Sequence, residues 1–513
     1  MGALSPTVSA RPRSLPRLCV SALSGGGGKT LLSLGLVRAL SSAGVAVRPF
    51  KKGPDYIDAA WLALAAGRPA TNLDPFFLPP AGLRALFIRA MTALADGEGD
   101  VLGLVEGNRG LFDGLDVEGS CSTAELARVL ACPILLSLDC TKMTRTAAAL
   151  IQGMLNFEAG LRFCGVVLNQ VGSARHERVL RHALETYTDM PVLGALPRLT
   201  ENPLPERHMG IASRGDILAE DAQRRLDDLA ALAREHLNLA DVLSAARSAP
   251  PLPGAAQNGA AYSAGGGVEV LSGPDGQNPA PAELPAPRIG YVRDAALWFY
   301  YQENLEALSR AGAELVRLSL LDGGHEEASA ASDPWLNLDG LYLGGGFPED
   351  CAAELSRSPR LPLLARLAEK GLPIYAECGG FMLLSRGIEH EGRLWPMCNV
   401  FPVTARFCAR PQGLGYVQGT VRAENPFFPP GLALRGHEFH YSHCRWEKQA
   451  PPCALELTRG KGMGLIDGAA RDGLTRGRVW AAYTHIFAPA VPCWAPNFTA
   501  AARKFQRERG STA

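Results

Sequence analysis

A glycine-rich loop, SGGGGKT (Ser24–Thr30), joins the apolar run RLCVSAL to the helical pattern LLSLGLVRAL near the start of the chain. Such a loop points successive backbone N–H groups at one spot, and the helix N-terminus adds partial positive charge, so a phosphate chain can bind there. Lys29 would reach the β- and γ-phosphates, and Thr30 would offer its hydroxyl to Mg²⁺. The strict motif has glycine where this chain has Leu23, and a glycine-rich helix start that binds nothing is the alternative. The sequence still predicts an ATP-binding loop made of Ser24, Gly25, Gly26, Gly27, Gly28, Lys29 and Thr30.

The alternation of apolar strand-like runs with helix-like stretches continues along the whole chain. Their near-continuous Val, Leu and Ile content fits strands covered on both faces, and the alternation predicts parallel sheets. The runs are residues 17–23, 45–50, 101–106, 133–139, 164–170 and 191–196, then 288–292, 313–319, 340–346 and 372–378. The predicted fold class is therefore α/β with two three-layer domains, the first a P-loop NTPase-like parallel sheet and the second more strand-rich after about Trp395.

One segment reads as a linker because it is rich in Pro, Gly and Ala and has few large apolar residues. A segment of that composition cannot bury enough surface to order itself. We therefore predict a disordered tail at residues 1–16, a nucleotide-binding domain at 17–247, a flexible linker at 248–287 and a second domain at 288–500.

Composition excludes several classes of partner. The formal net charge is zero, with 51 basic and 51 acidic residues, and no apolar run reaches the ~18 residues of a membrane span. We expect neither a nucleic acid nor a membrane as partner. The 12 cysteines form no CxxC pair and lie in core-like segments, which predicts reduced thiols in the cytoplasm.

Two acidic segments, FKKGPDYID and VEGNRGLFDG, follow the second and third predicted strands. Ligands of parallel α/β sheets bind at the carboxyl ends of the strands, where carboxylates can hold Mg²⁺. The four candidate carboxylates are Asp55, Asp58, Glu106 and Asp113. Glu106, at the end of a buried strand, is the strongest metal-ligand candidate, whereas each of the others could be a turn carboxylate, and Asp58 could cap the next helix.

Three further polar residues in this half remain open. Lys51 and Lys52 could be solvated charges or anion clamps, and Asn169 could read a purine edge through its amide.

A second reactive centre is indicated by IYAECGGFM, where an apolar strand ends at Cys378 and a helix follows. A nucleophile on such an elbow is expected to be exposed above the sheet, and the helix N-terminus favours its thiolate. The glycines of GLYLGGGFPED could supply N–H donors to an oxyanion, and His485 in WAAYTHIFAP could be the base. Taken alone, Cys378 reads as a core cysteine and His485 as a buried histidine with satisfied hydrogen bonds; together they predict acyl transfer.

The segment RGHEFHYSHC places His437, Glu438, His440 and His443 close together. It is not a zinc-protease motif, and its alternation fits a strand with two different faces. A substrate-facing or structural strand is the favoured interpretation, and a zinc site is the alternative.

The combination of motifs resembles the cobyrinate a,c-diamide synthase family, in which a dethiobiotin-synthetase-like ATP domain is fused to a class I (triad-type) glutamine amidotransferase domain. The matching segments span residues 17 to 490. They are SGGGGKT, FKKGPDYID, GRPATNLD, VEGNRGLFDG, VLNQVGSARH, LPERHMG, GGGFPE, AECGGFM, GHEFHYS and YTHI.

The resemblance implies a role for each matching residue. Cys378 would be the glutaminase nucleophile and His485 the group that raises its nucleophilicity. Backbone N–H groups around Gly345, Gly346 and Gly379 would bind the oxyanion. The glycine-rich loop and Asn169 would bind ATP. Mg²⁺ would be held by Thr30, Glu106 and Asp113. The corrinoid carboxylates would bind near Asp55, Tyr56 and Ile57.

The resemblance also implies the substrates cobyrinic acid, L-glutamine and ATP, with acyl-phosphate intermediates at the a and c acetates. A homodimer is compatible with the sequence, which does not determine the oligomeric state. The acid that usually follows the histidine by two positions is Phe487 here, which leaves His485 without an obvious orienting group. Hydrogenobyrinate and nickel-sirohydrochlorin are alternative substrates, and a P-loop switch protein with an inactive amidotransferase domain is a distant alternative.

Overall fold

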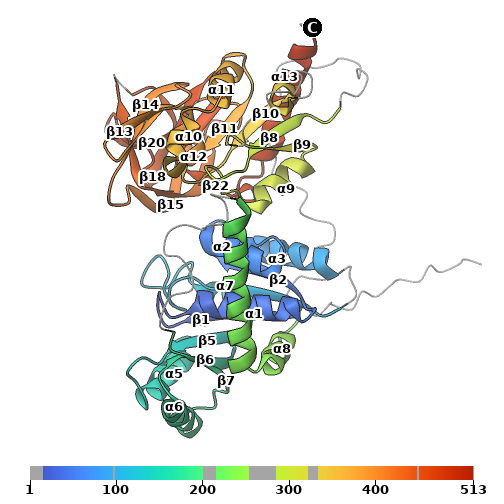
Figure 1. The fold of residues 1–513 in the computed structure, drawn as a ribbon, viewed down its shortest axis with the longest axis vertical. Coiled ribbons are helices and arrows are strands. Elements are labelled where there is room, and N and C mark those ends of the chain that lie inside the picture. The colour runs from blue at the N-terminus through green and yellow to red at the C-terminus, as the bar shows by residue number, and fades with distance from the viewer. Residues whose placement is uncertain are drawn as a thin grey trace, which may run out of the picture. The chain divides into compact units, whose positions relative to one another are not determined.

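The computed structural model describes residues 15–95, 99–199, 215–252, 285–321, 333–447 and 450–511. Most of the predicted tail and linker, and the LPERHMG segment, lie outside the described residues. The described chain forms two compact units, one comprising residues 15–199 and 216–252 and the other residues 285–511. Figure 1 shows both units as sheets flanked by helices.

The first unit is built on a parallel sheet, which among the described residues has seven strands in the order β3-β2-β4-β1-β5-β6-β7. The strands are β1 (Arg17–Ala22), β2 (Ala46–Lys52), β3 (Thr71–Leu73), β4 (Val101–Glu106), β5 (Ile134–Asp139), β6 (Phe163–Val171) and β7 (Val192–Pro197). The six predicted strands are all present, whereas β3 was not predicted. The strand β1 is buried at every residue, as a strand covered on both faces must be.

The helices of this unit lie between these strands or, for the last two, after β7. They are α1 (Lys29–Ser42), α2 (Ile57–Ala66), α3 (Pro80–Ala95), α4 (Thr123–Val129), α5 (Thr146–Phe157), α6 (Ala174–Tyr187), α7 (Gly215–His236) and α8 (Leu239–Arg247). The sheet register brings the strand ends together, because Glu106 pairs with Val20 of β1 and with Lys51 of β2. On the other side of β1, Asp139 at the end of β5 pairs with Asn169 of β6.

The second unit combines parallel and antiparallel pairing. Its strands are β8 (Arg288–Val292), β9 (Glu314–Leu318), β10 (Gly340–Leu343), β11 (Ile374–Glu377), β12 (Ser385–His390), β13 (Arg393–Pro396), β14 (Phe401–Phe407), β15 (Gly413–Val421), β16 (Ala433–His440), β17 (Ser442–Trp446), β18 (Cys453–Arg459), β19 (Gly464–Ile466), β20 (Ala469–Arg476), β21 (Val479–Ala482) and β22 (His485–Ile486). In the described part, the main sheet has the order β22-β16-β15-β18-β20-β21-β11-β10-β8-β9, with β19 paired to β20. A smaller sheet has the order β13-β12-β14-β17.

The helices of this unit are α9 (Gln302–Arg310), α10 (Ala352–Leu355), α11 (Arg360–Glu369), α12 (Gly379–Leu384) and α13 (Trp494–Ser511). They cover both faces of the main sheet. Successive side chains of a strand point to opposite faces, so each strand contributes to two cores. Leu341 and Leu343 join a core with α11 and α12, whereas Tyr342 between them joins a core with α9 and α13. The predicted three-layer α/β class is confirmed for this unit.

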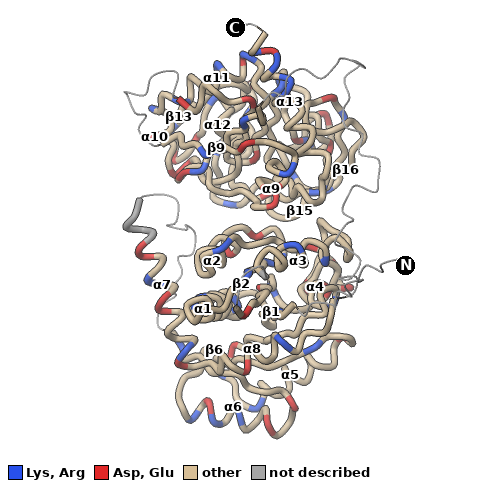
Figure 2. The backbone as a smooth tube through the Cα atoms, turned by 90° about the vertical axis from the view of Figure 1, so that its right-hand side faces the viewer, with Lys and Arg blue, Asp and Glu red and all other residues tan. Residues whose placement is uncertain are grey.

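Charges of both signs are interspersed along each unit, as Figure 2 shows. Among the described residues, no helix has the length and apolar character that a bilayer span requires.

Arg17 ties the first unit together at the start of β1. Its guanidinium is fully buried and donates to the carbonyl oxygens of Leu130 at 2.6 Å, Leu15 at 3.0 Å, Ala131 at 3.2 Å and Pro250 at 2.6 Å. Pro250 lies just beyond α8, so one side chain joins the beginning of the unit to its end.

We expect Arg17→Met to lower the free energy of unfolding of the first unit by about 3 kcal/mol, because several buried carbonyl oxygens lose their donor. Urea unfolding measures this change. As a control, Arg38→Met removes an exposed ion pair with Asp227 and is expected to cost below about 1 kcal/mol. Equal effects of the two substitutions would contradict the role assigned to Arg17.

Candidate active site

The glycine-rich loop begins helix α1 in a conformation that requires glycine at two of its positions. Gly28 has φ 78°, and a Cβ there would lie 1.9 Å from Nδ2 of Asn169. A Cβ on Gly27 would lie 2.8 Å from that of Ala22. Asn169, predicted from the sequence to bind ATP, therefore lies against the loop. Its contact with ATP stays a prediction.

Lys29 is held over the loop, since its Nζ donates to the Ser24 carbonyl at 3.1 Å. Burial lowers the pKa of Lys29, and the neighbouring charge of Lys51 lowers it further. An anion bound on the loop would offset the cost of burying this ammonium group.

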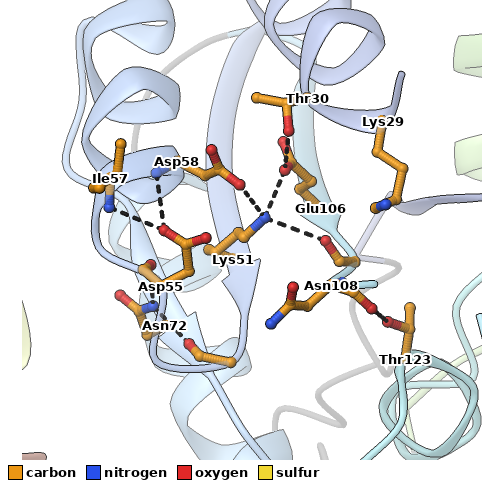
Figure 3. Close-up of polar contacts among 12 residues, drawn as sticks. Lys29, Thr30, Lys51, Asp55, Ile57, Asp58, Asn72, Glu106, Asn108 and Thr123 are labelled. Atoms are coloured by element: carbon orange, nitrogen blue, oxygen red, sulfur yellow. Dashed lines mark hydrogen bonds and ion pairs between the residues drawn. The ribbon is translucent and has the colours of Figure 1, made fainter. Parts of the chain in front are cut away.

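Lys51 stands at the centre of a buried ionic cluster at the carboxyl ends of β2 and β4 (Figure 3). Its Nζ lies 2.6 Å from Oδ2 of Asp58 and 2.6 Å from Oε1 of Glu106, and it donates to the Gly107 carbonyl at 3.2 Å. Oε1 of Glu106 also accepts the Thr30 hydroxyl at 3.0 Å. The loop, the second strand and the fourth strand thus meet at one cluster of charged groups.

The charges in this cluster depend on one another. Burial raises the pKa of Glu106 to about 7 although Lys51 lowers it, because the side chain has no exposed surface. Burial would lower the pKa of Lys51, but the charges of Glu106 and Asp58 outweigh it, so Lys51 stays an ammonium. Lys51 likewise outweighs burial at Asp58 and lowers the pKa of that carboxyl. Lys51 is therefore no solvated surface charge.

The two aspartates of the PDYID segment make different contacts. Oδ1 of Asp55, the residue before the N-cap, accepts the first two backbone N–H groups of α2, from Ile57 at 3.0 Å and from Asp58 at 3.1 Å. Asp58, considered as a possible cap, points to Lys51 instead, as Figure 3 shows. Tyr56 is buried and Ile57 is half-buried at the start of the same helix. Substrate contact by Asp55, Tyr56 and Ile57 stays a prediction.

Asp113 lies near Lys29 and contributes to its electrostatics, while its Oδ2 accepts the Gly110 N–H at 2.8 Å in a turn. Glu106 and Thr30 contact each other directly, and Asp58 joins them through Lys51. In the described part of the chain, no three His, Cys, Asp or Glu side chains are arranged to hold a metal ion by themselves. Oε2 of Glu106 is nevertheless buried without a hydrogen-bond partner among those residues, so the carboxylate has an oxygen left for a cation.

Cys378 occupies the predicted elbow between β11 and α12, with φ 48° and ψ −101°. This left-handed backbone is strained for a residue with a side chain. Gly380 allows the chain to pass close to β10, because a Cβ there would lie 2.4 Å from the Leu343 carbonyl oxygen. The elbow therefore fits the geometry of a positioned nucleophile.

The expectation that Cys378 is exposed above the sheet is wrong for this conformation, since the residue is only 4% exposed. Its Sγ lies 3.6 Å from the carbonyl oxygen of Phe439 in β16, a strand far away in the sequence that covers the elbow. Burial raises the pKa of the thiol, and the charge of Glu349 raises it further, while the Gly379 N–H lowers it. The expected thiolate is thus disfavoured here.

The three-glycine loop after β10 lies against both halves of the predicted glutaminase site. A Cβ on Gly345 would lie 2.5 Å from Cε1 of His485, and one on Gly379 would lie 3.0 Å from the Gly346 nitrogen. The Gly345 N–H already donates to the Phe299 carbonyl at 3.0 Å. In this conformation, Gly346 and Gly379 are therefore better oxyanion candidates than Gly345.

His485 is buried at the start of β22, and burial lowers its pKa to about 3. Its ring stacks on that of His437 at 4.7 Å between centroids, and Phe299 meets it edge-on at 4.9 Å. Its Nδ1 lies 3.6 Å from Oε2 of Glu377. A carboxylate directly before the nucleophile, which the sequence did not single out, thus lies beside the His485 ring.

The GHEFHYS segment runs from the end of β16 into the first residue of β17, and its β16 part has the predicted two faces. His437 faces His485, and its Nδ1 lies 3.0 Å from the Tyr301 hydroxyl. Glu438 accepts the N–H groups of Lys461 and Gly462, each at 2.8 Å, and so holds a turn. The strand contributes to the wall of the predicted glutaminase site, and within the described residues it forms no metal cluster.

Two family models match this chain, one for each unit. Residues 18–211 match the CobQ/CobB/MinD/ParA nucleotide-binding domain, and residues 288–491 match the CobB/CobQ-like glutamine amidotransferase domain. Together with the loop and the elbow, these matches define the class: a nucleotide-binding domain and a glutamine amidotransferase domain in one chain.

Relatives that match along nearly their whole length identify the family within this class. The cobyrinate a,c-diamide synthase of Magnetococcus marinus is 37% identical over 508 residues, which cover 98% of this chain and 99% of the relative. That of Syntrophotalea carbinolica is 38% identical and covers 92% and 95%, and that of Dehalococcoides mccartyi (strain ATCC BAA-2266) is 36% identical and covers 96% and 99%. The chain belongs to the cobyrinate a,c-diamide synthase family.

Proposed function

We propose that this protein uses ATP and glutamine to convert the a and c acetate side chains of cobyrinic acid into amides. The observation that carries the proposal is the match to synthases of that name over 98% of the chain, which includes both reactive centres. The enzyme is accordingly a carbon–nitrogen ligase of the cobalamin biosynthetic route, with glutamine as the nitrogen donor.

Ammonia is released in the second unit. His485 takes the proton of the Cys378 thiol as the sulfur attacks the side-chain amide carbon of glutamine, and it then delivers that proton to the departing ammonia. The oxyanion of the tetrahedral intermediate is stabilised by the Gly346 and Gly379 N–H groups. Water then hydrolyses the thioester to glutamate. Because burial disfavours the thiolate and the imidazolium, proton transfer from Cys378 to His485 is expected only when glutamine is bound.

The acceptor carboxylate is activated in the first unit. Its oxygen attacks the γ-phosphorus of ATP, ADP leaves, and the resulting acyl phosphate is an acyl donor that ammonia converts into amide and phosphate. The loop N–H groups and Lys29 hold the phosphates. Mg²⁺ would be held by Thr30 and Glu106, whose unpartnered Oε2 fits a cation, and would neutralise phosphate charge when bound.

The proposal is tested by incubating the protein with cobyrinic acid, ATP, Mg²⁺ and glutamine that carries ¹⁵N in its side-chain amide. Mass spectrometry is expected to show a diamide with ¹⁵N in both new amide groups, with ADP formed in step with each amide. Hydrogenobyrinic acid and nickel-sirohydrochlorin serve as parallel substrates. Amidation of either alternative while cobyrinic acid stays unchanged would overturn the substrate assignment.

A further inference from the structure

We propose that Glu377, the residue directly before the nucleophile, is the positioning residue that orients His485 for glutamine hydrolysis. The proposal deepens the function proposed above and rests on it. In this chain Phe487 occupies the position two residues after the histidine, where an acid is usual. Glu377, the last residue of β11, would take the place of that acid. The ring of Phe487 packs edge-on against Tyr301 at 5.1 Å and offers no polar atom.

The contacts of Glu377 use its two oxygens differently. Oε2 lies 3.6 Å from Nδ1 of His485 and accepts the Tyr342 hydroxyl at 2.8 Å. Oε1 accepts the backbone N–H of Ile486 at 2.9 Å and the Tyr375 hydroxyl at 3.3 Å. One carboxylate therefore faces the imidazole and also fixes the backbone of the next residue.

A second carboxylate holds the chain on the other side of the histidine. Oδ1 of Asp472 accepts the Tyr483 N–H at 3.0 Å, and Oδ2 accepts the Thr484 N–H at 2.8 Å and its hydroxyl at 2.6 Å. Asp472 thus fixes the two residues before His485, and Glu377 fixes the residue after it. Of these two acids, Glu377 is the one whose carboxylate contacts the ring.

The placement of Glu377 decides which nitrogen of His485 reacts. A carboxylate at Nδ1 favours the tautomer with the proton on Nδ1, which leaves Nε2 as the base. It would also stabilise the imidazolium that forms when the Cys378 proton is taken. Among the described groups around the ring, His437 is a buried imidazole, Tyr342 and Tyr375 are hydroxyls, and the charge of His440 lowers the pKa of His485, so none of these four stabilises the imidazolium as Glu377 would.

Burial gives this arrangement a pH dependence. The pKa of Glu377 is raised to about 7 by burial, against the hydrogen bonds from Ile486, Tyr342 and Tyr375. The carboxylate therefore forms as the pH rises through about 7. Glutamine hydrolysis that depends on it should rise over the same range.

The test compares parent and Glu377→Gln by glutamate release from glutamine, in the full-length protein. The glutamine side chain keeps an oxygen for the Ile486 N–H, but it removes the charge and offers an N–H to the imidazole. We expect kcat to fall about 100-fold, the KM for glutamine to change by less than about threefold, and the rise near pH 7 to disappear. Amidation with ammonium chloride in place of glutamine should stay within about twofold of the parent.

Two buried tyrosines provide a matched pair. Tyr342→Phe removes the hydrogen-bond donor to Oε2, the oxygen of Glu377 that faces the histidine. The pKa of Glu377 should therefore rise, and the increase in glutamine hydrolysis with pH should move to higher pH. Tyr375→Phe removes a longer hydrogen bond from Oε1, the other oxygen. The midpoint of the increase in glutamine hydrolysis with pH should stay within about 0.3 pH units of the parent.

Three outcomes would overturn the proposal. Glu377→Gln could keep glutamine hydrolysis within about threefold of the parent. It could instead lower the melting temperature and the ammonium-dependent activity together, which would indicate a structural role alone. A parent protein that releases no glutamate would overturn the proposed function as well, whereas failure with cobyrinic acid alone leaves the glutamate readout intact.

Discussion

Cys378→Ala is expected to abolish amidation from glutamine and to leave amidation from ammonium salts within about twofold of the parent. Loss of an enzymatic nucleophile lowers turnover by about 10⁴-fold or more, because no other group takes over the covalent step. Free ammonia bypasses that step, since it reacts with the acyl phosphate formed in the first unit. The measurement is the rate of corrinoid diamide formation with each nitrogen source.

Cys398 supplies the matched control. It belongs to the same hydrophobic core as Cys378 and is 7% exposed against 4%, and burial likewise raises the pKa of its thiol. Cys398→Ala should leave both nitrogen sources effective within about twofold. If Cys378→Ala retained more than about a tenth of the glutamine-dependent rate, Cys378 would be a core cysteine and the glutaminase assignment would fall.

Most strands of the parallel sheets could be predicted because they are buried, near-continuous apolar runs, although β9 is largely exposed or half-buried. The strand β3 could not, because it has only three residues, Thr71–Leu73, with a threonine and an asparagine in the first two positions. In the second half, the sequence indicated a strand-rich region after about Trp395 but not its order. The pairing of His437 with His485 across β16 and β22 depends on contacts between residues far apart, which no local pattern encodes.

The same limit separates the predicted parts of the sites from the missed ones. The loop and the elbow are local motifs, so Lys29, Thr30 and Cys378 could be found from short segments. Glu377 looks like an interior strand residue, and only the fold brings it to the Ile486 N–H, 109 positions later. The burial of Cys378 by Phe439 has the same origin.

Lys51→Met is expected to lower ATP-dependent amidation by about 10²–10³-fold with either nitrogen source, while glutamine hydrolysis in the second unit persists. Lys51 is 2% exposed and lies between the carboxylates of Glu106 and Asp58, so its loss leaves the buried Glu106 and the half-buried Asp58 without the ammonium group that contacts both. Breaking such a cluster costs about 3–5 kcal/mol. Urea unfolding of the first unit, followed by hydrogen exchange of peptides from β2 and β4, measures this cost.

The pH dependence of that cost follows from Glu106. Its pKa in the folded protein is raised to about 7, above its ordinary value, so the stability it contributes is present at low pH and is lost as the pH rises through about 7. At pH 5.5 Glu106 is largely protonated and the loss of Lys51 matters less. At pH 8 the folded protein must hold the charged form, so Lys51→Met should destabilise the first unit more at pH 8 than at pH 5.5.

Two further variants make this prediction decisive. Lys52→Met changes the next residue of β2, which is also buried but has its side chain on the other side of the strand, and it should preserve amidation within about threefold. Lys51→Met combined with Glu106→Gln removes a charge of each sign, so it should recover part of the lost stability without recovering amidation. If the double variant were less stable than Lys51→Met, or if Lys52→Met were as damaging as Lys51→Met, the cluster would not hold the charges assigned to it. If instead stability returned and amidation stayed low, Lys51 and Glu106 would act in the reaction itself, beyond their part in folding.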